Sequence, residues 1–251
     1  MIALRQIAVD SEIAIQPVGE TAVKVVFGQG ISPEIHYRVK ALIDHLDKAP
    51  FPGFIEYVAA FASVTVFYDL PVIKQLQQDS AEKDRPAYQF TGGLLRDIVS
   101  GLSAQAEAAP RVVEVPVCYG GEHGPDLAYV AEFNHLTAEQ VIELHSQGRY
   151  LVYMLGFAPG FPYLGGMPEC IAAPRRQSPR LNIPAGTVGI AGMQTGVYPI
   201  ATPGGWQLIG RTPLELFCPQ NNPPTLLKAG DIIKFRPISP QEYAEYGGES
   251  Q

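Results

Sequence analysis

The sequence predicts an α+β region followed by a barrel or sandwich of short strands. Glycine and proline make up 48 of the 251 residues (25 and 23), and this share of about 19% weakens an all-helical fold. The first hundred residues alternate short strands with helices, whereas apolar runs broken by glycine or proline follow from Leu151 onward. The small, polar AQAEAAP segment at 104–110 separates the two regions, so we expect two domains, residues 1–108 and 109–251.

The first region contains the signals of two strand pairs and three helices, which together suggest an open α+β sandwich. The β-branched runs 13–16 and 22–27 flank a turn with proline and glycine, which is typical of a hairpin. Ser32 and Pro33 form a helix start, because serine caps the first turn and proline fits the first helical position. The elements expected from this point are a helix over 33–48, strands over 54–60 and 63–68, a helix over 71–78 and a helix over 92–106.

The second region begins with a strand over 112–119 and a short helix over 125–133. Thr137 and Gln140 have the spacing of a capping box for a helix that ends near Gly148. Short strands follow, and the last is expected over 231–236. Many short strands broken by turn residues favour a barrel or a sandwich.

Charge argues against several classes of partner. Lysine and arginine total 18 and aspartate and glutamate total 25, so the net charge of −7 argues against broad binding to nucleic acid or to anionic membranes. The uncharged run 150–168 contains four glycines and three prolines, which would break a membrane-spanning helix. Asp10 and Glu12 lie where a signal peptide would be apolar, so export is not expected.

The cysteines favour a reducing compartment. Cys118, Cys170 and Cys218 are odd in number and far apart, with no CxxC pair. This pattern predicts neither a disulfide framework nor a zinc knuckle, and a cytoplasmic location fits it best.

Several common catalytic and cofactor motifs are absent from the sequence. None of the seven lysines is followed by serine or threonine, so there is no phosphate loop. The HExxH and GxSxG motifs are also absent, and no lysine is flanked by methionine as a biotin-carrying lysine would be. Gly28-Gln29-Gly30 follows a strand, but Pro33 breaks the dinucleotide pattern, so we interpret it as a turn.

The segment 151–212 has a local excess of positive charge, with a net charge of +3 in a chain of −7. Its charged residues are four arginines and one acid: Arg175, Arg176, Arg180, Arg211 and Glu169. Because a guanidinium group can hold a carboxylate or a phosphate through two parallel hydrogen bonds, the arginines predict an anion site. The alternative is that they pair with acids or loop carbonyls within the chain.

The same segment predicts a pocket wall, built from 156–166 and 203–206. The aromatic residues of these two stretches are Phe157, Phe161, Tyr163 and Trp206. Their rings supply apolar area, while neighbouring glycine and proline let the backbone approach a ligand closely. The alternative is that the rings only fill the core of the barrel.

His123 is the candidate acid–base residue. It lies in the loop YGGEHGPD, directly after one predicted strand and before a helix, where we expect Tyr119 and Asp126 to seat it. The alternative is a loop histidine that faces water beside Glu122. The other four histidines are expected at the surface: His36, His45, His135 and His145.

Long stretches of the chain resemble one protein family. They are VPVCYGGEHGPDL from Val115, MLGFAPGFPYLGGMPE from Met154, PRRQSP from Pro174, IPAGTVGIAGMQTGVYPIATPGGWQLIGRTPLELF from Ile183 and the closing KAGDIIKFRPI. Together with PVGETAVKVVFG near the start, they resemble the family of the 5-oxoprolinase B subunit, also called the sporulation-kinase inhibitor KipI or allophanate hydrolase subunit 1 family.

The resemblance implies an α+β N-terminal domain followed by a cyclophilin-like β-barrel domain. It also implies a direct complex with the 5-oxoprolinase C subunit that, together with the A subunit, opens 5-oxo-L-proline to L-glutamate at the expense of ATP. ATP, with Mg²⁺, would act in the complex and not through a phosphate loop of this chain, which we expect to be inactive alone. The four arginines would hold the substrate carboxylate and the transferred phosphate. We expect His123 to transfer a proton either when the lactam nitrogen leaves or when the attacking group is deprotonated.

Two alternatives to this enzyme role stay open. The first is a binding module that inhibits a sporulation histidine kinase through its barrel. The second is a component of a urea carboxylase or allophanate pathway, which the lack of a biotin site and of a fused amidase makes less favoured.

Overall fold

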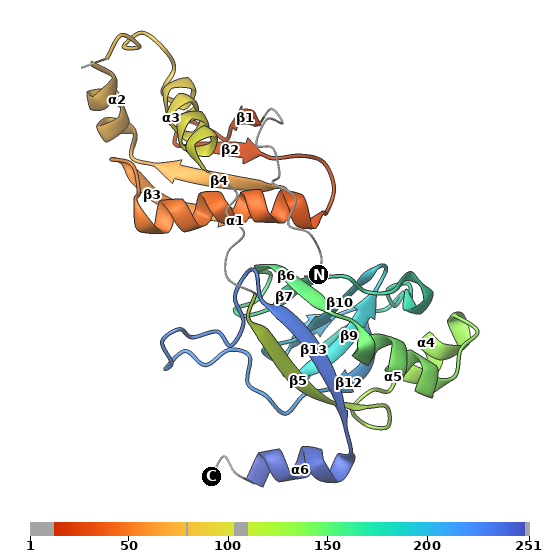
Figure 1. Ribbon diagram of the computed structural model, residues 1–251. Coiled ribbons are helices and arrows are strands. Elements are labelled where there is room, and N and C mark those ends of the chain that lie inside the picture. The colour runs from red at the N-terminus through yellow and green to blue at the C-terminus, as the bar shows by residue number, and fades with distance from the viewer. Residues whose placement is uncertain (1–12, 79, 103–109, 249–251) are drawn as a thin grey trace. The chain divides into compact units, whose positions relative to one another are not determined.

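The computed structural model describes residues 13–78, 80–102 and 110–248, and Figure 1 shows it as a ribbon. Residue contacts divide the chain into two units, Met1–Ala108 and Ala109–Gln251. The predicted boundary at 104–110 lies outside the described residues except for its last residue. Asp10 and Glu12, the acids that argue against a signal peptide, also lie outside them. Each unit has its own core and is described by itself.

The first unit contains a four-stranded antiparallel sheet with the strand order β1-β2-β4-β3. Its strands are β1 (Ala14–Pro17), β2 (Ala22–Val26), β3 (Phe54–Ala59) and β4 (Ser63–Tyr68). The predicted hairpin and the predicted second strand pair are both confirmed. Val64 and Val66 of β4 are fully buried, because alternate side chains of a half-covered sheet point toward the core.

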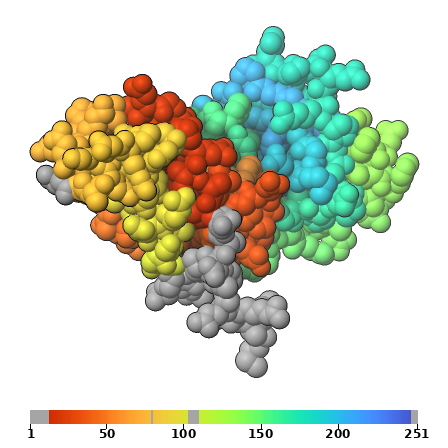
Figure 2. Space-filling model, turned by 90° about the horizontal axis from the view of Figure 1, so that it is seen from above, coloured from red at the N-terminus to blue at the C-terminus, as the bar shows by residue number. Residues whose placement is uncertain are grey.

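Three helices pack with this sheet: α1 (Pro33–Lys48), α2 (Leu70–Gln78) and α3 (Ala87–Gly101). α1 begins where the sequence predicts, since the Ser32 hydroxyl accepts a hydrogen bond from the Ile35 N–H at 3.2 Å. Side chains from all three helices join those of β2 and β4 in one hydrophobic cluster. α2 and α3 lie next to each other on the face of this unit that Figure 2 shows in gold and yellow.

The predicted bounds of the third helix are wrong at its start. α3 begins at Ala87 and contains Gly92, where the sequence predicts the first residue, and the predicted end at Ala106 lies outside the described residues. A Cβ at Gly92 would lie 2.8 Å from the side chain of Ile15 next to it. The glycine therefore lets the helix approach β1 closely rather than marking a helix end.

The second unit is built on a seven-stranded sheet with the order β10-β9-β12-β5-β13-β6-β7. β5 and β13 pair in parallel, and the other neighbours pair antiparallel. The edge strands β7 and β10 also contact each other, so the sheet forms a nearly closed barrel, one of the two predicted architectures. The strands are β5 (Val112–Tyr119), β6 (Tyr150–Leu155), β7 (Pro162–Gly165), β9 (Thr187–Ala191), β10 (Gln194–Val197), β12 (Gln207–Arg211) and β13 (Ile232–Ile238). A separate ribbon pairs β8 (Arg180–Ile183) with β11 (Thr202–Gly204).

The helical elements of this unit are α4 (Leu127–Phe133), α5 (Ala138–Gln147), the 3₁₀ turn η1 (Glu169–Ile171) and α6 (Pro240–Gly248). The capping box at the start of α5 is confirmed, with both of its hydrogen bonds present. α6 was not predicted, although Ser239 and Glu242 form the same reciprocal pair of hydrogen bonds at 3.1 and 2.8 Å. Among the helices that the structure describes, none combines the length and the apolar character needed to cross a membrane.

The predicted surface position of two histidines, His36 and His145, is wrong, because both are buried. The His145 ring lies on the inner face of α5, with Nε2 2.8 Å from the Thr195 hydroxyl and Nδ1 2.7 Å from the Tyr119 hydroxyl. Thr195 donates its own proton to the Gly189 carbonyl, so it accepts from Nε2–H, and Nδ1 accepts from Tyr119. Burial lowers the pKa of His145 to about 3, which keeps the ring neutral.

Candidate functional site

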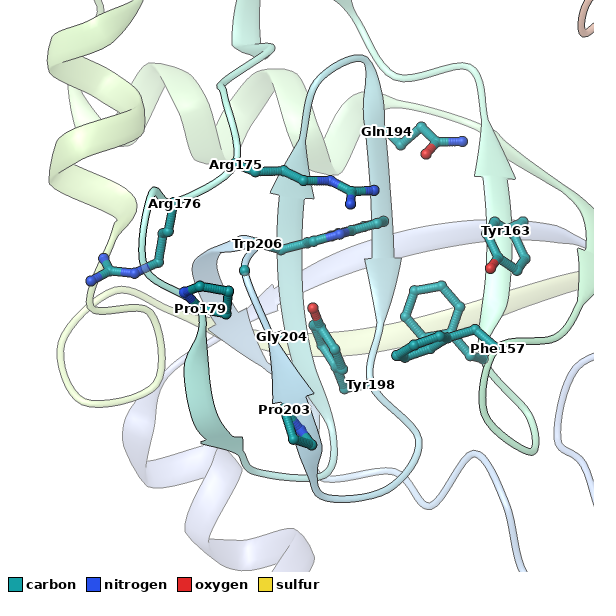
Figure 3. A pocket seen from close by; sticks show the side chains of 12 residues that line it. Phe157, Tyr163, Arg175, Arg176, Pro179, Gln194, Tyr198, Pro203, Gly204 and Trp206 are labelled. Carbon is teal, nitrogen blue, oxygen red and sulfur yellow. The ribbon is translucent and has the colours of Figure 1, made fainter.

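A pocket of about 390 Å³ opens in the second unit (Figure 3). Its walls come from the β6–β7 turn, the segment after β10, the β11–β12 segment and the loop of residues 174–180, which we name the arginine loop. The volume lies within the range of about 300 to 1,000 Å³ that is typical of small-molecule sites. The lining residues are Phe157, Phe161, Tyr163, Arg175, Arg176, Pro179, Gln194, Tyr198, Pro203, Gly204, Gly205 and Trp206.

The four aromatic residues that the sequence singles out all line this pocket. Phe161 is the central ring, with edge-to-face contacts to Phe157 at 5.5 Å, to Tyr163 at 5.3 Å and to Trp206 at 5.7 Å between centroids. Phe161 and Trp206 also belong to a buried cluster. The rings therefore combine the two alternatives, since the inner rings fill part of the core and the same rings form one wall of a cavity.

Phe157 is held in an unusual backbone conformation at the rim of the pocket. Its φ is 66°, a region that bulky residues rarely adopt, and its side chain is 67% exposed. A hydrogen bond of 2.7 Å from the Ala158 N–H to the Gly156 carbonyl closes a three-residue turn around it. Residues held in such conformations cluster at ligand-binding sites.

Two glycines make room for the rings. A Cβ at Gly196 would lie 3.0 Å from the Phe161 ring and 3.2 Å from the Trp206 ring. A Cβ at Gly204 would lie 2.6 Å from the Tyr198 hydroxyl. Glycine at these positions lets strands and rings approach more closely than any side chain would allow.

The polar side of the pocket contains Arg175, Gln194 and the Tyr198 hydroxyl. In Figure 3 the Arg175 side chain extends across the pocket beside Trp206, toward Gln194. Burial raises the pKa of Tyr198 to about 12, although the charge of Arg175 pulls the pKa down. Tyr198 therefore keeps its proton at neutral pH and can donate a hydrogen bond to a ligand.

The other two arginines of this loop point to a carboxylate of the protein. Arg176 Nη1 donates to Asp126 Oδ1 at 3.2 Å, and Arg180 Nη2 donates to the same oxygen at 2.8 Å. In Figure 3 the Arg176 guanidinium lies on the side of the loop opposite to Arg175. Arg176 and Arg180 therefore pair with an acid of the chain, which is the alternative to an anion site.

Arg211 and His123 are not among the residues that line the pocket. Arg211 Nε donates to the Ala185 carbonyl at 2.8 Å. The His123 ring packs against the ring of Tyr243 in α6, tilted by 38° with the centroids 4.3 Å apart, and its Nε2 lies 3.7 Å from a Glu122 carboxylate oxygen.

The predicted seat of His123 is wrong. The Tyr119 hydroxyl bonds to His145, and the Asp126 carboxylate is occupied by the two arginines and by the Leu208 N–H. Both side chains are already engaged in the interior, so neither orients His123. α6, which the sequence analysis missed, supplies the ring that does contact it.

Comparisons with known proteins identify the family of this chain. Residues 13–227 match the family of the carboxyltransferase domain, subdomains C and D. The 5-oxoprolinase B subunit of Bacillus subtilis (strain 168) is 53% identical over 237 residues, which are 94% of this chain and 97% of that protein. The chain belongs to the 5-oxoprolinase B-subunit family.

Two solved structures extend the comparison. The crystal structure of TTHA0988 in space group P212121 is 37% identical with a TM-score of 0.72, over 87% of this chain but only 40% of that one. The urea amidolyase of K. lactis is 19% identical with a TM-score of 0.71, over 96% of this chain and 16% of that one, and shows the fold alone. This chain therefore spans less than half the length of either structure.

Within this member of the B-subunit family, the residues of the pocket all lie inside the matched range 13–227. Three lining residues, Tyr198, Gln194 and Pro179, were not predicted to line a pocket, and Asp126 was not predicted as the partner of the arginines. The sequence pointed to Asp126 only as a neighbour of His123, and no signal linked it to arginines 50 and 54 residues away. No three His, Cys, Asp or Glu side chains within the described residues come together as a metal site.

Proposed function

We propose that this chain is the B subunit of an ATP-dependent 5-oxoprolinase and that its pocket binds 5-oxo-L-proline. The observation that carries the proposal is a pocket with aromatic rings on one side and the Arg175 guanidinium on another, in a chain of the 5-oxoprolinase B-subunit family. The faces of the lactam ring suit Trp206 and Phe161, and its carboxylate suits a guanidinium fork. Tyr198 donates a hydrogen bond to an oxygen of the same ligand.

The reaction needs activation because an amide nitrogen is a poor leaving group. Transfer of the γ-phosphoryl group of ATP to the amide oxygen makes the ring carbon electrophilic. Water then adds to that carbon, the C–N bond breaks as the nitrogen takes a proton, and a second water releases phosphate to leave glutamate. In this scheme the residues of the pocket bind and orient the lactam, while ATP with Mg²⁺ acts in the complex.

The partners in this proposal are the C subunit, which binds this chain directly, and the A subunit. The lengths of the two solved structures support a larger assembly. The segment that matches this chain is only 40% of one of those chains and 16% of the other, so there the same fold is joined to further polypeptide. The same proposal includes two independently folding domains, a cyclophilin-like barrel for the second, a cytoplasmic location and no activity of this chain alone.

His123 and Arg211 have a different place in the proposal from the residues of the pocket. Neither lines the pocket, so in this proposal each acts on a group that a partner protein or a second substrate brings to it. We keep His123 as a proton donor to the lactam nitrogen in the assembled enzyme, because imidazole is a side chain that both gives and takes protons in general acid–base catalysis.

Reconstitution tests the function. This chain is mixed with the corresponding A and C subunits, and glutamate release from 5-oxo-L-proline is measured with and without ATP. We expect release only with all three proteins and ATP, and a raised KM for 5-oxo-L-proline in Arg175→Gln. Arg149→Gln, an exposed arginine outside the pocket, is the matched control and should behave as the wild type.

Two outcomes would contradict the proposal. One is a lack of ATP-dependent glutamate release from the mixture of the three proteins. The other is inhibition of a sporulation histidine kinase by a chain that leaves 5-oxo-L-proline intact, which would favour the binding-module alternative.

A further inference from the structure

The Asp126 carboxylate joins three segments of the second unit. Its side chain is 8% exposed, directly before α4. Oδ2 accepts a hydrogen bond of 2.7 Å from the Leu208 N–H, and the Asp126 N–H donates to the Leu208 carbonyl at 2.9 Å. Oδ1 accepts from Arg176 and from Arg180. One buried carboxylate thus connects the start of α4 to β12, through Leu208, and to the arginine loop, through Arg176 and Arg180.

The arginine loop has two further attachments, and both lead to the pocket wall. The Arg176 N–H donates to the Gly205 carbonyl at 2.8 Å, and the Gln207 side-chain amide donates to the Pro174 carbonyl at 2.9 Å. These contacts flank Trp206. The loop and the tryptophan are therefore held in one frame, and within it Arg175 is exposed.

Two of the arginines in this frame need a negative charge between them. The guanidinium groups of Arg176 and Arg180 meet at one oxygen atom, so they repel each other unless a carboxylate lies between them. Asp126 is that carboxylate, and it is fixed by the backbone of β12 rather than by a flexible contact. Its loss frees the side chains of Arg176 and Arg180 and leaves the loop attached only through the Pro174 carbonyl and the Arg176 N–H.

We propose that Asp126 is a positioning residue, which anchors the arginine loop through Arg176 and Arg180 and thereby places Arg175 beside Trp206 as the cation for the ligand's carboxylate. The inference rests on the proposed function for the identity of the ligand. It divides the arginines of the loop by role. Arg175 faces the ligand, whereas Arg176, although it also lines the pocket, and Arg180 act on the loop through Asp126.

The direction in which anion affinity changes in an Asp126 variant tests this inference. Asp126→Asn removes a negative charge near the pocket, and Coulomb attraction alone would then strengthen the binding of an anion. Loss of the anchor predicts the opposite, because Arg175 is no longer held in place. The two effects point in opposite directions, so the direction of the change decides between them.

The assay uses the fluorescence of Trp206, which is the single tryptophan of the chain. The full-length chain is titrated with 5-oxo-L-proline and with 2-pyrrolidinone, the same lactam without a carboxylate. We expect Asp126→Asn to weaken 5-oxo-L-proline binding by about 10- to 100-fold, the worth of one charge-assisted hydrogen bond, and to leave 2-pyrrolidinone binding unchanged. Equal or tighter binding of 5-oxo-L-proline by the variant would overturn the inference.

Asp231→Asn is the matched control. Asp231 is also a buried carboxylate that accepts from an arginine, Arg111, and from a backbone N–H, that of Lys228, but it lies outside the pocket. Both variants should lower thermal stability to a similar extent, whereas only Asp126→Asn should change binding. A similar loss of binding in both would show that general destabilisation is the cause.

A double-mutant cycle separates anchoring from direct contact. If Arg176 acts through Asp126, Arg176→Gln weakens binding in the wild type but adds nothing in the Asp126→Asn background. An equal further loss in that background would mean that Arg176 touches the ligand, and would overturn the division of roles.

A ligand-free measurement keeps this inference separate from the proposed function. Iodide, a small anion, quenches Trp206 more strongly where Arg175 lies beside the ring, while neutral acrylamide does not sense the charge. We expect the ratio of iodide to acrylamide quenching to fall in Asp126→Asn and in Arg175→Gln. Absence of 5-oxo-L-proline binding by the wild type would refute the function of the pocket, whereas an unchanged ratio in Asp126→Asn would refute the positioning role.

Discussion

Acid should destabilise the second unit through its buried histidine. The His145 side chain is 0% exposed, and burial lowers its pKa from 6.5 to about 3. Between these two values the unfolded chain binds a proton that the folded chain does not. The stabilisation is therefore complete above pH 6.5 and is lost as the pH falls toward 3.

The magnitude follows from the ordinary pKa of histidine. At pH 5 the folded-state ring is still neutral, so the loss depends on the 1.5 units between pH 5 and the unfolded pKa of about 6.5. Each unit corresponds to about 1.4 kcal/mol, so His145 alone should lower the free energy of unfolding by about 2 kcal/mol at pH 5. A second ring proton on Nδ1 would displace the hydrogen bond that Tyr119 donates to this nitrogen.

The assay is urea unfolding of the full chain at pH 5.0, 5.75 and 6.5, followed by Trp206 fluorescence, which reports on the second unit. His145→Gln removes the titrating ring and should flatten the pH dependence of the unfolding free energy over this range. His135→Asn is the matched control, because His135 is exposed and its φ of 57° suits asparagine. The reasoning fails if His145→Gln keeps the wild-type slope, or if His135→Asn flattens it equally.

Three further predictions concern the linker, a glycine and the candidate acid–base residue. Limited proteolysis should cut first within 104–111 or 77–85, and recovery of one uncut core would argue against two domains. Gly124→Ala should lower the free energy of unfolding by about 1 to 3 kcal/mol, because its Cβ would lie 2.1 Å from a backbone oxygen of β12. Gly93→Ala is the control: the site is open and lies on a helix, so this change should raise the free energy of unfolding by up to about 1 kcal/mol, as measured by thermal unfolding. His123→Gln should lower turnover of the reconstituted enzyme by roughly 100-fold with complex formation intact, and weaker binding to the partner proteins at normal turnover would instead make His123 an interface residue.

Local signals in the sequence determined most of the elements. Ser32 with Pro33 and Thr137 with Gln140 fix helix starts through contacts within four residues, so they are readable without a fold. The same kind of signal at Ser239 and Glu242 was present but went unused, and α6 was missed. The aromatic and glycine-rich stretches marked the pocket wall because ring area and close backbone approach are properties of composition.

The roles of the charged and titratable residues were decided by the tertiary structure. Arg175 and Arg176 are neighbours in the sequence, yet the extended loop turns them to opposite sides, one across the pocket and one toward Asp126. His145 lies on an amphipathic helix, where a histidine is usually at the surface. Its ring can be buried because Tyr119 and Thr195, which are 26 and 50 residues away, satisfy both ring nitrogens. Charged residues pair, and polar groups are buried with partners, only where the closed barrel brings segments that are far apart in the sequence into contact.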